Sequence, residues 1–88
     1  MNLLLVEDEA ITRKGMLKHI PWGSFGVDAV KAAENADRAL KLCGEWKPDI
    51  ILSDIRMRGL DGIEMCRLML ERFPDCQIVF CSGYSQKE

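Results

Sequence analysis

The fold class follows first from residues 47–54, which read Lys47-Pro48-Asp49-Ile50-Ile51-Leu52-Ser53-Asp54. At its centre, residues 50–52 form a short apolar run that is rich in β-branched side chains. A strand buried on both faces of a parallel sheet has this composition, whereas a strand exposed on one face alternates between apolar and polar residues. The stretch therefore predicts a central parallel strand that ends at Asp54.

Three further segments predict strands. Leu3 to Val6 and Ile78 to Cys81 are uninterrupted apolar runs of the same kind. Val27 to Lys31 alternates between apolar and polar residues, as an edge strand does. We expect four strands, with residues 27–31 at an edge of the sheet.

The segments between the strands predict helices. Apolar residues at helical spacing run from Ala36 to Trp46, and Asn35 stands at the N-cap position. Glu9 to Ile20 predicts another helix, with Ile11, Met16, Leu17 and Ile20 facing inward and Pro21 ending it.

The last predicted helix follows the central strand. Asp61-Gly62-Ile63-Glu64 has the spacing of a capping box, and Pro74 ends the pattern. We expect its inward stripe to consist of Ile63, Cys66, Leu70 and Phe73. A further helix stub is expected from Ser85.

Strands and helices thus alternate over 88 residues, which is enough for one domain spanning residues 1–88. Regular alternation with short connections is typical of α/β proteins, in which right-handed crossovers place helices on both faces of a parallel sheet. The sequence predicts a doubly wound parallel sheet.

The composition excludes several functional classes. Twelve Lys and Arg against fourteen Asp and Glu give a net charge of -2, so this segment lacks the basic excess of a nucleic-acid-binding domain. The longest apolar runs are far shorter than the roughly 18 residues of a membrane span. The amino-terminal stretch becomes acidic at Glu7, too early for a secretory signal peptide, and we expect a cytoplasmic protein.

The cysteines fit a reducing compartment. The chain has no C-x-x-C pair and a single histidine, His19, which argues against a structural zinc site built from Cys43, Cys66, Cys76 and Cys81. Free cysteine is among the residues most often buried. We interpret the four thiols as small apolar core residues.

Polar side chains follow three of the predicted strands. Glu7 and Asp8 end the first strand, Asp54 ends the third, and Ser82 ends the fourth. In open parallel sheets ligands bind at the carboxyl ends of the strands, close to the point where the strand order reverses. We expect these four side chains to share one edge of the sheet.

Three carboxylates at one edge need a cation or a proton. Two like charges about 4 Å apart repel by roughly 4 kcal/mol at an effective dielectric constant of 20. Mg²⁺ prefers oxygen ligands and often shares them with a phosphate. An aspartate beside Mg²⁺ can act as a nucleophile toward phosphorus, and Asp54, at the end of the central strand, is the best candidate.

At this point the sequence resembles the receiver domains of bacterial response regulators. The resemblance covers nearly the whole chain and is carried by Leu4-Leu5-Val6-Glu7-Asp8-Glu9, Lys47 to Met57, Asp61-Gly62 and Cys81-Ser82-Gly83-Tyr84. It implies a flavodoxin-like receiver fold with strand order 2-1-3-4, without the fifth strand and fifth helix that receivers usually have.

The resemblance also implies roles for individual residues. Asp54 would be the phosphoacceptor and Ser82 the switch hydroxyl. Glu7, Asp8, Asp54 and the backbone carbonyl of Arg56 would hold Mg²⁺. The implied partner is a sensor histidine kinase, and Ile20 to Gly26 further resembles receivers joined to arabinose-regulator-type helix-turn-helix output domains.

Two departures from the family pattern keep an alternative open. Arg58 stands where proline is usual, and no fifth strand with its phosphate-contacting lysine follows before Glu88. The alternative is a receiver-like interaction domain that works without phosphorylation. An aspartyl-nucleophile phosphatase is disfavoured because Arg56 occupies the position of its second carboxylate, so we expect a regulatory module and not an enzyme. Uncovered apolar surface would favour self-association of the 88-residue chain.

Overall fold

The computed structural model describes residues 1–54 and 62–81. Strands and helices alternate along the chain as expected, and the boundaries agree with the predicted ones to within about two residues at most ends. In chain order the elements are β1 (Asn2–Val6), α1 (Ala10–His19), a short 3-10 helix η1 (Trp22–Phe25), β2 (Ala29–Ala33), α2 (Ala36–Trp46), β3 (Ile50–Asp54), α3 (Gly62–Arg72) and β4 (Gln77–Cys81).

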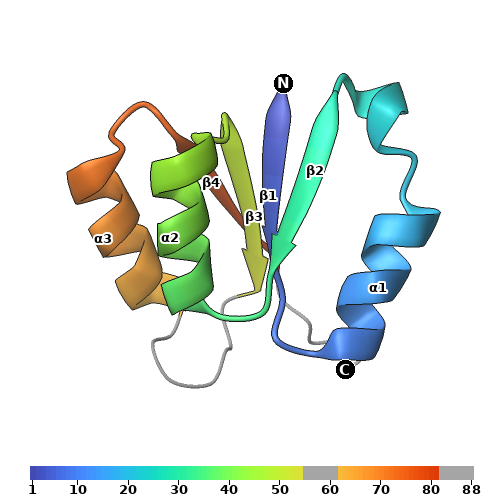
Figure 1. Cartoon of the computed structure of the whole chain (residues 1–88), viewed down its shortest axis with the longest axis horizontal. Coiled ribbons are helices and arrows are strands. Elements are labelled where there is room, and N and C mark those ends of the chain that lie inside the picture. Colours follow the sequence, from blue (N-terminus) through green and yellow to red (C-terminus); the bar gives the residue numbers. More distant parts are fainter. Residues whose placement is uncertain (55–61, 82–88) are drawn as a thin grey trace.

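The four strands form one parallel sheet with the order β2-β1-β3-β4. This confirms the predicted parallel α/β fold and the strand order 2-1-3-4. Helix α1 lies on one face of the sheet, and α2 and α3 lie side by side on the other (Figure 1). The central strands β1 and β3 therefore carry the residues that are covered from both sides.

The larger core lies between the sheet and the helices α2 and α3. Helix α2 begins as predicted, because the Asn35 side chain accepts a 2.7 Å hydrogen bond from the backbone N–H of Arg38. This bond satisfies one of the N–H groups that the first helical turn leaves without a partner. The buried residues of this core are Leu4, Val6, Ala33, Ala36, Ala39, Leu42, Cys43, Ile51, Met65 and Met69.

The predicted inward stripe of α3 is wrong at Ile63 and Leu70, whereas Phe73, just after the helix, packs against the core as predicted. Met65 and Met69 are fully buried, whereas Ile63 is 59% exposed and Leu70 is 51% exposed. Apolar residues occur on several sides of this helix, so spacing alone does not select the buried side. The long, unbranched methionine side chains fill the space over the sheet.

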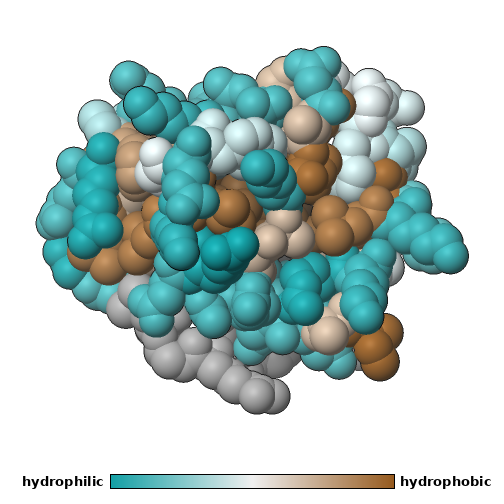
Figure 2. Space-filling view, in the orientation of Figure 1, coloured by the Kyte–Doolittle hydropathy of each residue, from teal (hydrophilic) through white to brown (hydrophobic). Residues whose placement is uncertain are grey.

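The smaller core lies on the α1 face. It consists of Leu3, Leu5 and Val27, with Met16 and Trp22 among the partly buried residues packed against it. Helix α1 has no fully buried residue, and two residues predicted to face inward, Ile11 and Leu17, are exposed to 81% and 38%. Figure 2 shows apolar surface lying between the mostly hydrophilic outer surfaces of the helices.

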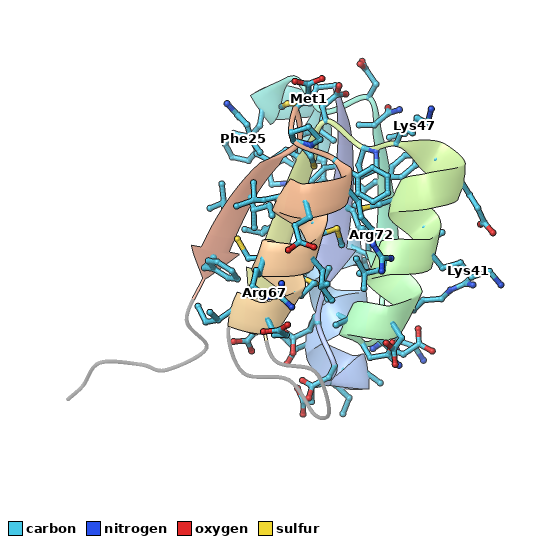
Figure 3. All side chains as sticks on the ribbon, turned by 90° about the vertical axis from the view of Figure 1, so that its left-hand side faces the viewer. Met1, Phe25, Lys41, Lys47, Arg67 and Arg72 are labelled. Carbon is cyan, nitrogen blue, oxygen red and sulfur yellow. The ribbon has the colours of Figure 1, made fainter. Side chains whose placement is uncertain are left out.

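The outer surfaces of the helices are charged. Arg67 on α3 forms ion pairs with Glu64 and Glu71, which lie one turn before and one turn after it. Figure 3 shows Arg67 and Arg72 on α3, with Lys41 and Lys47 at α2. No helix among the described residues has both the length and the apolar character needed to cross a membrane.

Candidate functional site

The predicted acidic residues meet at the carboxyl ends of the two central strands. Val6 pairs with Ser53 in the parallel register of β1 and β3, so Glu7 and Asp54 are the next residues on neighbouring strands. One carboxylate oxygen each from Glu7, Asp8 and Asp54 lies within 4.8 Å of the others. Two other predicted site residues, Arg56 and Ser82, lie outside the described residues.

Glu7 is the most buried member of this acidic cluster, with 7% of its surface exposed. Its backbone N–H donates a 3.0 Å hydrogen bond to the carbonyl oxygen of Ala33, which extends the pairing of β1 with β2 by one residue. Burial raises the pKa of the Glu7 carboxyl, and the nearby charges of Asp54 and Asp8 raise it further. Glu7 is therefore costly to ionise in the absence of a cation.

The backbone N–H of Glu9 opposes part of this effect. It donates a 3.2 Å hydrogen bond to Oε2 of Glu7, and this bond lowers the pKa of the Glu7 carboxyl. Glu9 also precedes α1, and its carboxylate accepts a hydrogen bond from the Thr12 hydroxyl. The turn between β1 and α1 is thus ordered around the acidic cluster.

Sequence reasoning missed two polar residues beside the acidic cluster. Ser53 is fully buried, and its hydroxyl donates a 2.9 Å hydrogen bond to the backbone carbonyl of Asp54. Arg13 donates from Nη1 to the backbone carbonyl of Glu7, also at 2.9 Å. Ser53 is not acidic although it precedes Asp54 in the sequence, and Arg13 reaches the site only through the path of the chain.

The donor set suits a hard divalent cation. All three side chains offer carboxylate oxygens, which are the ligands that Mg²⁺ takes in proteins, commonly together with water and phosphate oxygens. Neutralisation by a cation would also relieve the mutual repulsion that raises the pKa of Glu7. The residues present therefore fit a magnesium site.

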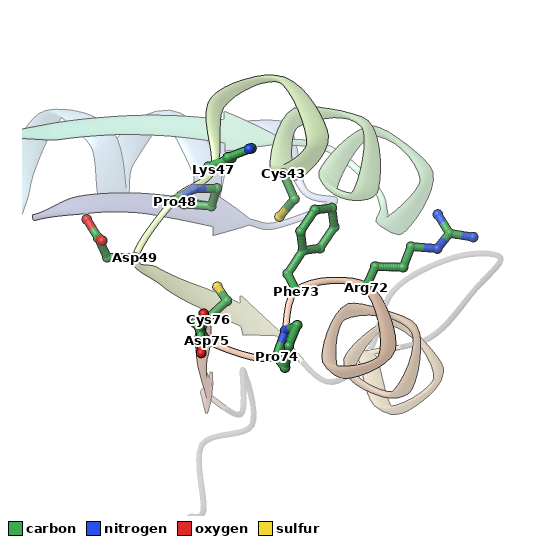
Figure 4. Close-up of a pocket in the computed structure, with 9 residues that line it drawn as sticks. All are labelled: Cys43, Lys47, Pro48, Asp49, Arg72, Phe73, Pro74, Asp75 and Cys76. Atoms are coloured by element: carbon green, nitrogen blue, oxygen red, sulfur yellow. The ribbon is translucent and has the colours of Figure 1, made fainter.

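A cavity of about 430 Å³ lies at the opposite ends of the strands. Its walls come from the end of α2, the end of α3 and the segments that lead into β3 and β4 (Figure 4). Lys47 and Asp49 lie near the start of β3, and Asp75 and Cys76 lie before β4. The cavity is therefore separate from the acidic cluster at the carboxyl ends.

Two thiols line this cavity. Cys43 is buried, and burial raises its pKa to about 12. The pKa of Cys76 is also raised, mainly by burial and further by the charge of Asp49. Both thiols are protonated at neutral pH and are therefore poor nucleophiles. Cys43 confirms the interpretation of the cysteines as core residues, whereas Cys66 and Cys76 are only half-buried.

The fold and the acidic cluster together define a parallel α/β domain with a cation-binding edge at its strand reversal. Comparison with known proteins identifies the family. The family model of the response regulator receiver domain matches residues 3–88. The chain belongs to the response regulator receiver domain family, whose members are signalling modules of two-component regulatory systems.

Individual relatives agree with this assignment. The chain is 34% identical over 86 residues to the positive alginate biosynthesis regulatory protein of Pseudomonas aeruginosa, covering 98% of this chain and 35% of the relative. It is 31% identical over 87 residues to the transcriptional regulatory protein YesN of Bacillus subtilis, covering 99% of this chain and 24% of that protein. The chain thus spans about a quarter to a third of the length of these relatives.

Solved structures show the same fold. A two component transcriptional regulator AraC from Clostridium phytofermentans superposes with a TM-score of 0.87 at 36% identity, covering 99% of this chain and 70% of that one. The response regulator TrrA from Thermotoga maritima, crystallised in complex with Mg²⁺ and BeF, superposes with a TM-score of 0.81 at 30% identity, covering 96% and 70%. The first of these agrees with the expected similarity to receivers of the arabinose-regulator type.

Proposed function

We propose that this receiver domain accepts a phosphoryl group on Asp54, with Mg²⁺ held by Glu7, Asp8 and Asp54, and thereby switches an output. The observation that carries the proposal is the convergence of three carboxylate oxygens within 4.8 Å at the ends of the central strands. The complex of Thermotoga TrrA with Mg²⁺ and BeF supports it by analogy.

The proposed donor is the phosphohistidine of a sensor histidine kinase. A carboxylate oxygen of Asp54 would form a bond to phosphorus as the bond between phosphorus and the imidazole nitrogen breaks. The electron pair of the broken bond leaves with the imidazole, which then takes up a proton from water. Mg²⁺, when bound, would offset the charge on the phosphoryl oxygens during the transfer.

The surrounding residues would position Asp54 for this reaction. Asp54 is the last residue of β3, and the parallel register fixes its backbone beside β1. The buried hydroxyl of Ser53 donates a hydrogen bond to the backbone carbonyl of Asp54. By resemblance, the backbone carbonyl of Arg56 would be a further metal ligand and Ser82 would donate its hydroxyl to the phosphoryl group.

The output is proposed to be transcriptional. Several relatives are named as transcriptional regulators, and they are longer than this chain. Because the described domain is acidic overall, DNA binding would belong to another part of such a protein. We place the protein in the cytoplasm, where a sensor kinase could reach it.

The test is transfer from a small acyl phosphate in the presence of Mg²⁺, followed by intact-protein mass spectrometry. It uses the protein encoded by the complete reading frame that contains this chain. We expect the mass of one phosphoryl group to be added, and this addition to be lost in Asp54→Asn, because an amide is not a nucleophile.

Asp49→Asn is the matched control. Asp49 immediately precedes β3, so the substitution makes the same chemical change at the other end of the strand. This variant should be labelled as the parent is. A parent that takes up no phosphoryl group from acyl phosphate or from a kinase would favour the alternative, a domain that works by protein contacts alone.

A further inference from the structure

One hydrogen bond ties helix α1 to the acidic cluster. Arg13 lies on the first turns of α1, and its Nη1 atom donates a 2.9 Å, partly buried hydrogen bond to the backbone carbonyl of Glu7. Long side chains on a helix lean toward its N-terminus. This direction brings the guanidinium of Arg13 back over the end of β1.

Two hydrogen bonds from position 13, one from the side chain and one from the backbone, hold the acidic turn. The side chain of Arg13 binds the carbonyl of Glu7, and the backbone N–H of Arg13 donates a 2.9 Å hydrogen bond to the carbonyl of Glu9. Asp8 lies between these two carbonyls. The arginine side chain therefore holds the start of the segment that supplies two of the three carboxylates, and the first backbone hydrogen bond of α1 holds its end.

The carbonyl of Glu7 belongs to the peptide group that joins Glu7 to Asp8. The backbone N–H of Glu7 is held by Ala33 of β2, one residue beyond the last strand pair. With the carbonyl held by Arg13, the backbone of Glu7 is restrained on both sides. These two bonds restrain the backbone from which the Glu7 and Asp8 side chains project.

The positive charge of Arg13 and its ordering of the turn should change cation affinity in opposite directions. A positive guanidinium beside a cation site weakens cation binding by Coulomb repulsion. An ordered ligand set strengthens it, and loss of a residue that orients metal ligands typically lowers affinity about 10- to 100-fold. The sign of the change on removing Arg13 therefore distinguishes the two effects.

We propose that Arg13 is a positioning residue that holds the turn from Glu7 to Glu9 in the conformation that binds a divalent cation. The proposal rests on the proposed function for its effect on metal binding. Its structural part, the ordering of the turn, is independent of any metal.

The first test measures binding of Mn²⁺, which like Mg²⁺ takes oxygen ligands, by the EPR signal of the free ion at constant ionic strength. Three variants of the complete protein are compared with the parent. Arg13→Met removes both charge and donor and should weaken binding about 10-fold. Arg13→Lys keeps a donor and should restore most of the affinity.

Lys14→Met is the matched control, because Lys14 is the next residue on α1, is exposed and carries the same charge. It should bind Mn²⁺ as tightly as the parent or slightly more tightly. Unchanged or tighter binding by Arg13→Met would overturn the proposal. A lysine variant as weak as the methionine variant would also count against it.

The second test is amide hydrogen exchange in the metal-free protein. The N–H of Glu9 is bonded to the Glu7 carboxylate and should exchange faster in Arg13→Met. The N–H of Ile20, bonded to Met16 at the far end of α1, should be unaffected. A parent without Mn²⁺ binding would disprove the metal site, while an unchanged Glu9 amide would disprove the role of Arg13.

Discussion

Val6 on β1 and Ser53 on β3 are partners in the parallel register, which makes the next residues on the two strands, Glu7 and Asp54, immediate neighbours. Strand pairing brings these two acids together although they lie 47 positions apart in the sequence. The acidic cluster is thus a property of the sheet, to which the turn after β1 adds Asp8.

Mg²⁺ should stabilise the folded protein. A ligand that binds only the folded state stabilises it by mass action, by about 2.7 kcal/mol at a hundred times Kd. Asp8→Ala should abolish the Mg²⁺-dependent rise in Tm measured by differential scanning fluorimetry. Asp75→Ala, an exposed acid before β4, should respond as the parent does. An Asp8→Ala variant that keeps the full response would show that the metal site is elsewhere.

Ionisation of Glu7 should destabilise the metal-free protein. Its pKa in the folded state is raised above the model-compound value of 4.5, chiefly by burial, so the folded state holds this proton to a higher pH than the unfolded state. The stabilisation that results from this raised pKa is fully present below pH 4.5, where Glu7 is protonated. It is lost as the pH rises through the pKa of Glu7 in the folded state.

Glu7→Gln should remove that loss and leave the metal-free protein more stable than the parent at pH 7. Urea denaturation in EDTA between pH 4 and pH 7 measures the difference. Glu45→Gln, at an exposed position on α2, provides the comparison. A parent that gains stability relative to Glu7→Gln as the pH rises would contradict the assigned direction of the pKa.

Neighbouring residues of α3 should differ in their contribution to stability. Met69→Ala removes a fully buried side chain and should lower the free energy of unfolding by about 2–5 kcal/mol. Leu70→Ala affects a residue that is 51% exposed and should cost less than about 1 kcal/mol. Chemical denaturation measures both losses. Equal losses of unfolding free energy in the two variants would mean that α3 is rotated about its axis.

The 88-residue chain should self-associate at micromolar concentration. Val79 lies on β4, which pairs only with β3 among the described residues, and 45% of its surface is exposed. Exposed apolar strand edges promote pairing between chains, and a lysine placed on such an edge opposes it. Light scattering should therefore detect oligomers that Val79→Lys reduces.

The control for this measurement is Ser24→Lys, which adds the same charge on η1. It should leave the association unchanged. A parent chain that scatters light as a folded monomer would show that the exposed part of β4 is not a self-association surface.

Much of the fold could be predicted from the sequence because buried parallel strands have few alternatives. The apolar runs at Leu3 to Val6 and Ile50 to Leu52 are too short for independent helices and too uniform for half-exposed strands. The buried side of α3 could not be predicted, because Ile63 and Met65 both continue apolar patterns at helical spacing. Packing against Ile51 and α2 makes that choice.

The candidate site could likewise be predicted only in part from the sequence. Glu7, Asp8 and Asp54 could be placed from the sequence, because the ends of parallel strands lie at one edge of the sheet. Arg13 could not, since a basic residue on a helix usually faces solvent. Its contact with the Glu7 carbonyl depends on the path of the turn between β1 and α1.

The parallel pairing of β1 and β3 also limits which substitutions can resize the cation site. Neighbouring strands lie about 4.8 Å apart, a spacing set by main-chain hydrogen bonds and nearly independent of side-chain identity. The backbones that carry Glu7 and Asp54 therefore keep their separation when the outer helix surfaces change. Changes in ion selectivity should arise from the turn that carries Asp8 and from shortened or lengthened acidic side chains.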